Sequence, residues 1–150
     1  MDVIFDIDGT LLNIEHRLKF IKKSPKDWKS FRDPKQKHWD EPIVPVINLM
    51  SALYFGGETV ILCSGRTLSE KEDTLNSLKS YTGEWIYDIP SYFRNDGDFR
   101  EDTVVKSELL DAMYTHDFEP TMVFDDRPSV IRMWRERGLK VADVGYGEEF

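Results

Sequence analysis

Residues 2–10 read DVIFDIDGT, an apolar run that ends abruptly in two carboxylates and a glycine. Runs of Val, Ile and Phe are typical of a buried strand, and we predict that this strand stops at Asp6. Because Asp6 and Asp8 flank a single residue, their side chains point the same way in an extended chain. Gly9 allows the chain to turn tightly away from the strand, which exposes both carboxylates. The stretch therefore predicts a strand whose end carries two acids.

Outside this stretch, helical and strand patterns alternate along the chain. We predict helices over 42–53, 70–81, 103–113 and 129–137, strands over 59–63, 121–124 and 140–144, and a polar loop over 91–102. Such alternation is typical of a doubly wound α/β fold, in which a mostly parallel sheet is covered by helices on both faces. Ligands in these folds bind beyond the carboxyl ends of the strands, where we expect Asp6, Ser64 and Asp125.

The length of 150 residues fits one domain over 1–150. Within it, residues 13–41 are mostly polar and contain Pro25 and Pro34, so we expect a small helical insert rather than one long helix. Three widely spaced aromatic residues in the insert could stack a base, although packing against the domain is expected for at least two of them. These residues are Trp28, Phe31 and Trp39.

The composition narrows the classes of function. The net charge of −8 argues against a broad surface that tracks nucleic-acid phosphates, but not against a pocket that holds one phosphate. The one cysteine, Cys63, lies in an apolar run, so we expect a buried thiol and no intramolecular disulfide. No apolar stretch approaches the ~20 residues of a membrane span, and the N-terminus is unlike a signal peptide, so we expect a cytoplasmic protein.

A second acidic pair, Asp125-Asp126, follows the apolar residues 121–124. An Asp-x-Asp sequence alone is more often a capped turn with solvated acids. Two such pairs at neighbouring strand ends would repel each other unless a cation lies between them, and carboxylate oxygens favour magnesium over zinc or copper. The sequence therefore predicts a magnesium site built from Asp6, Asp8, Asp125 and Asp126.

Phosphoryl transfer needs a nucleophile, a proton donor and fixed positive charge. A carboxylate beside magnesium can attack phosphorus and form an aspartyl-phosphate, while a second carboxylate protonates the leaving oxygen and later activates water. Asp6 and Asp8 can divide these roles. Ser64, with the amide after it, and Lys106 offer the donors that the phosphoryl oxygens require.

In order and spacing, these motifs resemble those of the haloacid dehalogenase (HAD) superfamily of phosphohydrolases. The motifs are Asp6 to Thr10, Ser64, Lys106 and Asp125-Asp126, and they span almost the whole chain. The resemblance implies a HAD-like Rossmannoid fold in which Asp6 is the nucleophile and Asp8 is the general acid and base. It also implies that Ser64 and Lys106 hold the phosphoryl oxygens.

The same resemblance implies a metal set and a cap. Carried over to this chain, magnesium is held by Asp6, Asp126 and the backbone carbonyl of Asp8, with Asp125 acting through water. The insert over 13–41 lies where the superfamily places its cap. A dehalogenase would not need Asp8, and a phosphonate-cleaving member would need a cap lysine, of which the sequence shows no sign, so the resemblance implies a phosphatase.

A closer resemblance is to the phosphatase domain of phage polynucleotide kinase/phosphatase enzymes. The matching residues are Arg17, Ser64-Gly65-Arg66, Lys71-Glu72-Asp73, the run from Arg94 to Lys106, Asp125-Asp126-Arg127, Met133-Trp134-Arg135 and Gly147. This resemblance implies removal of 3′-phosphates from nucleic-acid ends or nucleotides. The chain has no Gly-x-x-x-x-Gly-Lys-Ser/Thr sequence, so the ATP-using 5′-kinase half is absent and a separate kinase or ligase partner is expected.

Five residues are candidates for binding the substrate: Thr10, Arg17, Gly65, Arg66 and Arg100. Arginine presents a planar fork that matches phosphate, but each arginine could instead form a surface ion pair in a chain with 28 acidic residues. Its position just after Ser64 favours a functional role for Arg66, and the two interpretations are balanced for Arg17. Arg100, like Arg127, is more simply explained by ion pairs with acids such as Asp98 or Asp102.

Two alternatives stay open. A 5′(3′)-nucleotidase acting on free mononucleotides would suit the acidic net charge better than a polynucleotide 3′-phosphatase does. A non-catalytic subunit that binds phosphorylated ends would be expected to lack an acid at position 6 or 8, and both acids are present. The sequence therefore favours a magnesium-dependent 3′-phosphatase of nucleic-acid ends or nucleotides.

Overall fold

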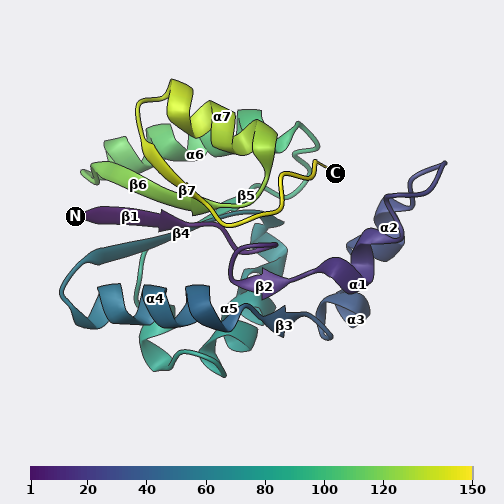
Figure 1. Ribbon diagram of the computed structural model, residues 1–150, viewed down its shortest axis with the longest axis horizontal. Coiled ribbons are helices and arrows are strands. Elements are labelled where there is room, and N and C mark those ends of the chain that lie inside the picture. Colours follow the sequence, from purple (N-terminus) through teal and green to yellow (C-terminus); the bar gives the residue numbers. More distant parts are fainter. Residues whose placement is uncertain (150) are drawn as a thin grey trace.

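The centre of the molecule is a five-stranded parallel sheet (Figure 1). The computed structural model describes residues 1–149. Its sheet strands are β1 (Asp2–Phe5), β4 (Thr59–Thr67), β5 (Ser91–Arg94), β6 (Pro120–Asp125) and β7 (Lys140–Asp143), in the order β5-β4-β1-β6-β7. The chain fills one side of β1 first and then the other, so a ligand site is expected at the carboxyl end of β1, where the winding direction changes. This arrangement confirms the doubly wound α/β fold.

Helices cover both faces of the sheet (Figure 1). On one face lie α4 (Val44–Phe55) and α5 (Lys71–Lys79), and on the other lie α6 (Asp102–Thr115) and α7 (Pro128–Glu136). Side chains alternate between the two faces along β1, so Phe5 joins one apolar cluster and Ile4 joins the other. Cys63 is buried in the second cluster, as predicted, and burial raises the pKa of its thiol to about 12.

One strand, β5, lies where the sequence predicted a polar loop over 91–102, so that prediction was wrong for 91–94. Phe93 is the one apolar residue of β5 that is fully buried, which leaves little strand pattern to detect. Pairing with β4 supplies the backbone hydrogen bonds that stabilise this edge strand. Between the two strands the chain forms η1 (Leu68–Glu70), α5 and η2 (Glu84–Tyr87), the η elements being short 3-10 helices.

Residues between β1 and α4 form a small insert that extends away from the sheet (Figure 1). Its elements are β2 (Leu12–Asn13), α1 (Glu15–Leu18), α2 (Trp28–Phe31), α3 (Pro34–Lys37) and β3 (Glu41–Pro42). Antiparallel pairing of β2 with β3 closes the base of the insert, and Ile14, Ile21 and Phe31 form a separate apolar cluster inside it. The loop between α1 and α2 reaches farthest from the sheet in Figure 1.

In the part of the chain that the structure describes, no helix has both the length and the apolar character that crossing a membrane requires.

Candidate active site

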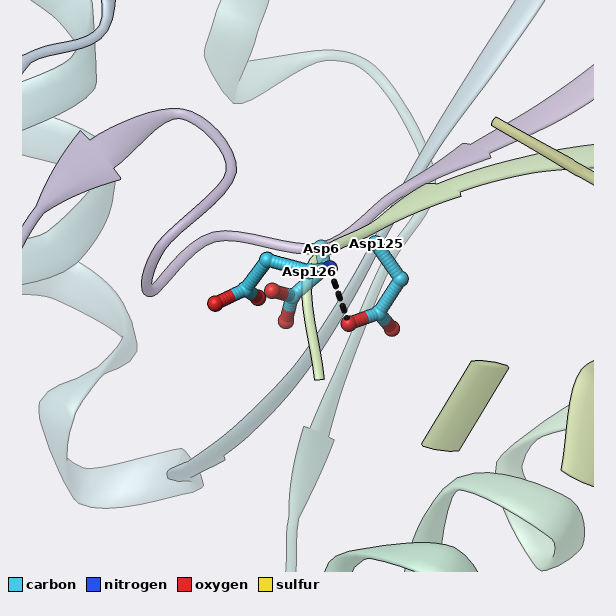
Figure 2. Close-up of side chains that lie close together, drawn as sticks. All are labelled: Asp6, Asp125 and Asp126. Atoms are coloured by element: carbon cyan, nitrogen blue, oxygen red, sulfur yellow. Dashed lines mark hydrogen bonds between the residues drawn. The ribbon is translucent and has the colours of Figure 1, made fainter. Parts of the chain in front are cut away.

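Three carboxylates meet at the carboxyl ends of β1 and β6 (Figure 2). Asp6 follows β1 directly, Asp125 is the last residue of β6, and Asp126 comes next. The two strands are parallel neighbours, so their ends lie together, and one oxygen from each carboxylate lies within 4.8 Å of the others. The backbone N–H of Asp126 donates to Oδ1 of Asp125 at 2.8 Å, which fixes the direction of the second acidic pair.

Gly9 and Thr10 shape the turn that carries Asp6. Gly9 has a φ of +84°, and a Cβ at this position would lie 2.0 Å from Oδ2 of Asp126, so the turn needs glycine both for its conformation and for space. Thr10 is buried, and its hydroxyl donates to Oδ2 of Asp6 at 3.0 Å and to Oδ1 of Asp126 at 3.4 Å. Thr10 was predicted to bind substrate, but the structure directs its hydroxyl at the carboxylates.

Lys106 brings a positive charge from α6 into this cluster. Its ammonium donates to Oδ1 of Asp6 at 2.7 Å and to Oδ2 of Asp125 at 3.2 Å. The indole N–H of Trp134, on α7, donates to the same Oδ2 of Asp125 at 3.0 Å. Both oxygens of Asp125 therefore have protein donors, and so do both oxygens of Asp6, Oδ1 from Lys106 and Oδ2 from Thr10.

The electrostatics of the cluster favour a cation. Burial, and then the charge of Asp125, raise the pKa of Asp6 well above its usual range, and the same two causes raise the pKa of Asp126 to about 6. Burial alone would lower the pKa of Lys106, but Asp125 and Asp6 hold it well above its usual value. One ammonium does not neutralise two buried carboxylates and a half-buried one, so a divalent cation would offset the remaining charge.

The donor atoms available fit magnesium. Oxygens of Asp6 and Asp126 lie in the cluster, and within residues 1–149 the backbone carbonyl of Asp8 accepts no hydrogen bond, so it too is available. An all-oxygen set of carboxylates and a carbonyl is the kind that Mg²⁺ prefers, usually with several waters. The side chain of Asp8 does not join the cluster.

Asp8 instead faces two arginines. Arg66 donates to Asp8 from Nη2 at 2.5 Å and from Nε at 3.1 Å, and Arg17 donates from Nη2 at 3.1 Å. Burial alone would raise the pKa of Asp8, but the charge of Arg66, followed by that of Arg17, lowers it well below its usual range. Asp8 is therefore a carboxylate in this state, and an anion that took over these guanidinium N–H groups would remove the cause of its low pKa.

The carboxylate of Asp40 accepts hydrogen bonds from both arginines, a role that the sequence analysis did not predict. Its Oδ2 accepts from Nη2 of Arg17 at 2.8 Å and from Nη2 of Arg66 at 2.9 Å, and its Oδ1 accepts from Nε of Arg17 at 2.8 Å. The ring of His16 lies 2.6 Å from the same Oδ1. Arg17 is 0% exposed and Arg66 is 7% exposed, so the surface ion pairs left open for these two residues are excluded.

Ser64 and Gly65 lie in an irregular part of β4, where the pairing register with β5 shifts. Ser64 is buried, and its hydroxyl accepts from the backbone N–H of Arg66 at 3.0 Å, so it helps to set the direction of Arg66. A Cβ at Gly65 would lie 2.6 Å from Oδ1 of Asp102, so this position has no room for a side chain. Gly65 lines the cavity next to Asp102, the first residue of α6.

Arg94 fixes the loop after β5 through hydrogen bonds to backbone carbonyls of the loop. The sequence analysis assigned no role to this residue. Arg94 is buried and donates to the carbonyls of Gly65 at 2.8 Å and Arg100 at 2.6 Å, and it pairs with Asp102. Arg127 also pairs with Asp102, at 3.0 Å. The half-exposed side chain of Arg100 pairs with Asp98 at 2.8 Å and with Glu108 at 2.7 Å.

A cavity of about 860 Å³ opens above these groups, within the range of roughly 300–1,000 Å³ typical of ligand sites. Its floor includes Asp6, Asp8, Lys106 and Asp126, and its walls include Lys26, Trp28, Arg32 and Lys37 from the insert and Phe99 and Arg100 from the loop after β5. The sequence showed no sign of a cap lysine, but two lysines of the insert, Lys26 and Lys37, line the cavity. Burial, and then Arg66, lower the pKa of Lys37 to about 7, and Lys37 pairs with Glu70.

The family model described as "Polynucleotide kinase PNKP phosphatase domain" matches residues 1–149. A protein of Autographa californica nuclear polyhedrosis virus, named as a bifunctional polynucleotide kinase/RNA ligase, is 29% identical over an alignment of 147 positions, which covers 95% of this chain and 18% of the viral protein.

Solved structures show the same similarity. A chain in the structure of the Pnkp1/Rnl/Hen1 RNA repair complex aligns with a TM-score of 0.74 at 28% identity, covering 98% of this chain and 43% of that chain. A haloacid dehalogenase-like hydrolase from Streptococcus pneumoniae has the same fold, with a TM-score of 0.71 at 16% identity, covering 98% of this chain and 86% of the hydrolase. The present chain thus spans less than half the length of the viral protein and of the repair-complex chain.

Proposed function

Because this chain belongs to the family of the polynucleotide kinase PNKP phosphatase domain and is a HAD-type phosphatase, we propose that it removes 3′-phosphates from nucleic-acid ends through an aspartyl-phosphate at Asp6. The observation that carries the proposed chemistry is the position of the Asp6 carboxylate, 2.7 Å from the ammonium of Lys106 and beside Asp126. The family match over 1–149 supports the choice of substrate.

The first half of the reaction transfers the phosphoryl group to the protein. A carboxylate oxygen of Asp6 attacks phosphorus, and the bond from phosphorus to the 3′-oxygen of the sugar breaks. Asp8 supplies the proton that the leaving oxygen takes, and Lys106 offers N–H groups to the phosphoryl oxygens. Magnesium held by Asp6, Asp126 and the Asp8 carbonyl would neutralise charge shared by the carboxylates and the phosphoryl group.

The second half releases inorganic phosphate. Water attacks phosphorus, the bond to Asp6 breaks, and Asp8 takes the proton that the water loses. Asp8 therefore has to be protonated before the first half and ionised before the second. We propose that Arg17 and Arg66 govern this, because a bound phosphate competes with Asp8 for their N–H groups and lets its pKa rise.

A comparison of substrates tests the proposed specificity. We expect turnover of a 3′-phosphorylated oligonucleotide to exceed that of a 3′-mononucleotide, and both to exceed that of a 5′-mononucleotide. The acidic net charge of −8 favours the alternative, a nucleotidase acting on free mononucleotides. Preference for 5′-mononucleotides, measured as kcat/KM with magnesium present, would establish the alternative and reject the 3′-phosphatase.

We also propose that this domain works beside a kinase or ligase. The viral relative is named for both activities, and the present chain matches only 18% of it, so the other steps of end repair would have to come from elsewhere.

Asp40→Asn tests the role of the two arginines. The amide keeps the volume of the side chain but offers one acceptor and no charge, so Arg17 and Arg66 lose the group that fixes both guanidiniums. We expect kcat/KM to fall roughly tenfold, mainly through a higher KM. Asp33→Asn is the matched control, since Asp33 lies in the same insert and caps α3 without touching either arginine. Equal kcat/KM values in the two variants would contradict this positioning role.

A further inference from the structure

The insert has the opposite charge to the rest of the chain. Of the 20 basic and 28 acidic residues, nine basic and five acidic ones lie in residues 13–41, which gives the insert a net charge of +4 and the remainder −12. The nine basic residues are Arg17, Lys19, Lys22, Lys23, Lys26, Lys29, Arg32, Lys35 and Lys37. The overall charge of −8 therefore hides a basic segment beside the active site.

Most of this positive charge is exposed and unpaired. Seven of the nine basic side chains are exposed, all except Arg17 and Lys37. Within residues 1–149, five of these seven form no ion pair with a carboxylate: Lys19, Lys26, Lys29, Arg32 and Lys35. Exposed cations without acidic partners, on a protein that is otherwise strongly acidic, indicate a surface for a polyanion.

The basic segment is continuous with the active-site cavity. Lys26, Trp28 and Arg32, here called the insert wall, line the same cavity as Asp6 and Lys106. The Lys26 ammonium and the Arg32 guanidinium lie 5.5 Å and 5.1 Å from the Trp28 ring centroid. Trp28 packs edge-on against Phe31, which is buried, so this contact holds the indole in place beside the two cations.

We propose that the insert wall binds the single strand next to its 3′-phosphorylated end, with Trp28 stacking on a base and Lys26 and Arg32 neutralising internal phosphates. Stacking on aromatic side chains and neutralisation of the backbone are the two recurring means of binding single strands without reading sequence. The acidic remainder of the protein repels the strand and so confines it to the insert. The identity of the end group rests on the proposed function, but strand binding does not.

A length series with matched variants tests this through activity. The substrates are uridine 3′-monophosphate and 3′-phosphorylated oligouridylates of two, four and eight nucleotides. We expect kcat/KM to rise roughly tenfold from the monomer to the tetramer, and the rise to be lost in Lys26→Gln/Arg32→Gln. The control, Arg135→Gln/Lys140→Gln, removes the same charge from exposed residues outside the cavity and should keep the rise.

Binding to an octauridylate with a 3′-hydroxyl end gives a readout that does not need hydrolysis. In fluorescence anisotropy, the plot of log affinity against log salt should become shallower by about 0.7 for each phosphate contact removed in Lys26→Gln/Arg32→Gln. Trp28→Leu should weaken binding roughly tenfold without changing this slope.

The two experiments separate failure of this inference from failure of the proposed function. If kcat/KM does not depend on substrate length, or if the length effect persists in Lys26→Gln/Arg32→Gln, strand binding by the insert wall is rejected. The proposed 3′-phosphatase activity is not affected by that result. If strand binding requires the insert wall but no 3′-phosphate is hydrolysed, the 3′-phosphatase is rejected and the role of the insert wall is supported. Binding to phosphatidylserine vesicles but not to the strand would assign the basic insert to a membrane surface and reject the proposal.

Discussion

Replacing Asp6 with asparagine is expected to abolish hydrolysis, lowering kcat by roughly 10⁴-fold or more with every phosphomonoester. The amide has nearly the same shape but is neutral and is not a nucleophile towards phosphorus. Because burial and Asp125 already disfavour the charged form of Asp6, the neutral side chain should leave the metal-free protein at least as stable as the native one. Loss of activity would therefore come without loss of the fold.

The measurement for Asp6→Asn combines steady-state hydrolysis with thermal unfolding, each with magnesium and with EDTA. Asp88→Asn is a suitable control, because Asp88 is exposed and lies outside the cavity. We expect magnesium to stabilise the native protein and the control more than Asp6→Asn. Substantial hydrolysis by Asp6→Asn, or native hydrolysis that is indifferent to EDTA, would contradict the account.

Lys106→Met is expected to lower both kcat and the free energy of unfolding. Methionine fills a similar length but removes the ammonium between Asp6 and Asp125, so we expect kcat to fall by roughly 10³-fold. Removing one partner of a buried ion pair typically costs about 3–5 kcal/mol. The loss should be larger near pH 8 than near pH 5, because carboxylates with raised pKa values, such as Asp126 at about 6, are protonated at the lower pH and no longer need a cation.

Urea unfolding of Lys106→Met at the two pH values, without metal, measures this dependence. Lys140→Met is the control, since Lys140 is exposed at the opposite end of the sheet from the cluster and should cause little change at either pH. A destabilisation that is the same at both pH values would show that Lys106 acts through packing rather than through the charges of the cluster.

The elements that could be predicted are those whose own residues form a clear local pattern. Apolar residues lead directly to Asp6 and, in a second run, directly to Asp125. Each run predicts a strand, and the acid that follows it predicts where the strand ends. β5 could not be predicted in this way, because it is an edge strand that owes its structure to pairing with β4. Its one buried apolar residue, Phe93, carries too little pattern.

The site could be predicted only in part. Parallel strands end at one edge of a sheet, so the sequence places Asp6 near Asp125 and Asp126 without further information. The positions of Asp40 and Trp134 depend on contacts between distant segments, and nothing in their neighbouring residues reveals that one fixes two arginines and the other donates to Asp125. The basic insert is visible in the sequence, but only when the charge is counted by segment rather than over the whole chain.

The most direct test of the central claim is to trap the phosphoryl group on the protein. In Asp8→Asn, an activated aryl phosphate can still transfer its phosphoryl group, because the aryl leaving group needs no proton, while the second half lacks its base. Acid quenching followed by peptide mass spectrometry should find one phosphoryl group on Asp6. A phosphoryl group on another residue, or hydrolysis with no adduct on Asp6 in either the native protein or Asp8→Asn, would contradict the account.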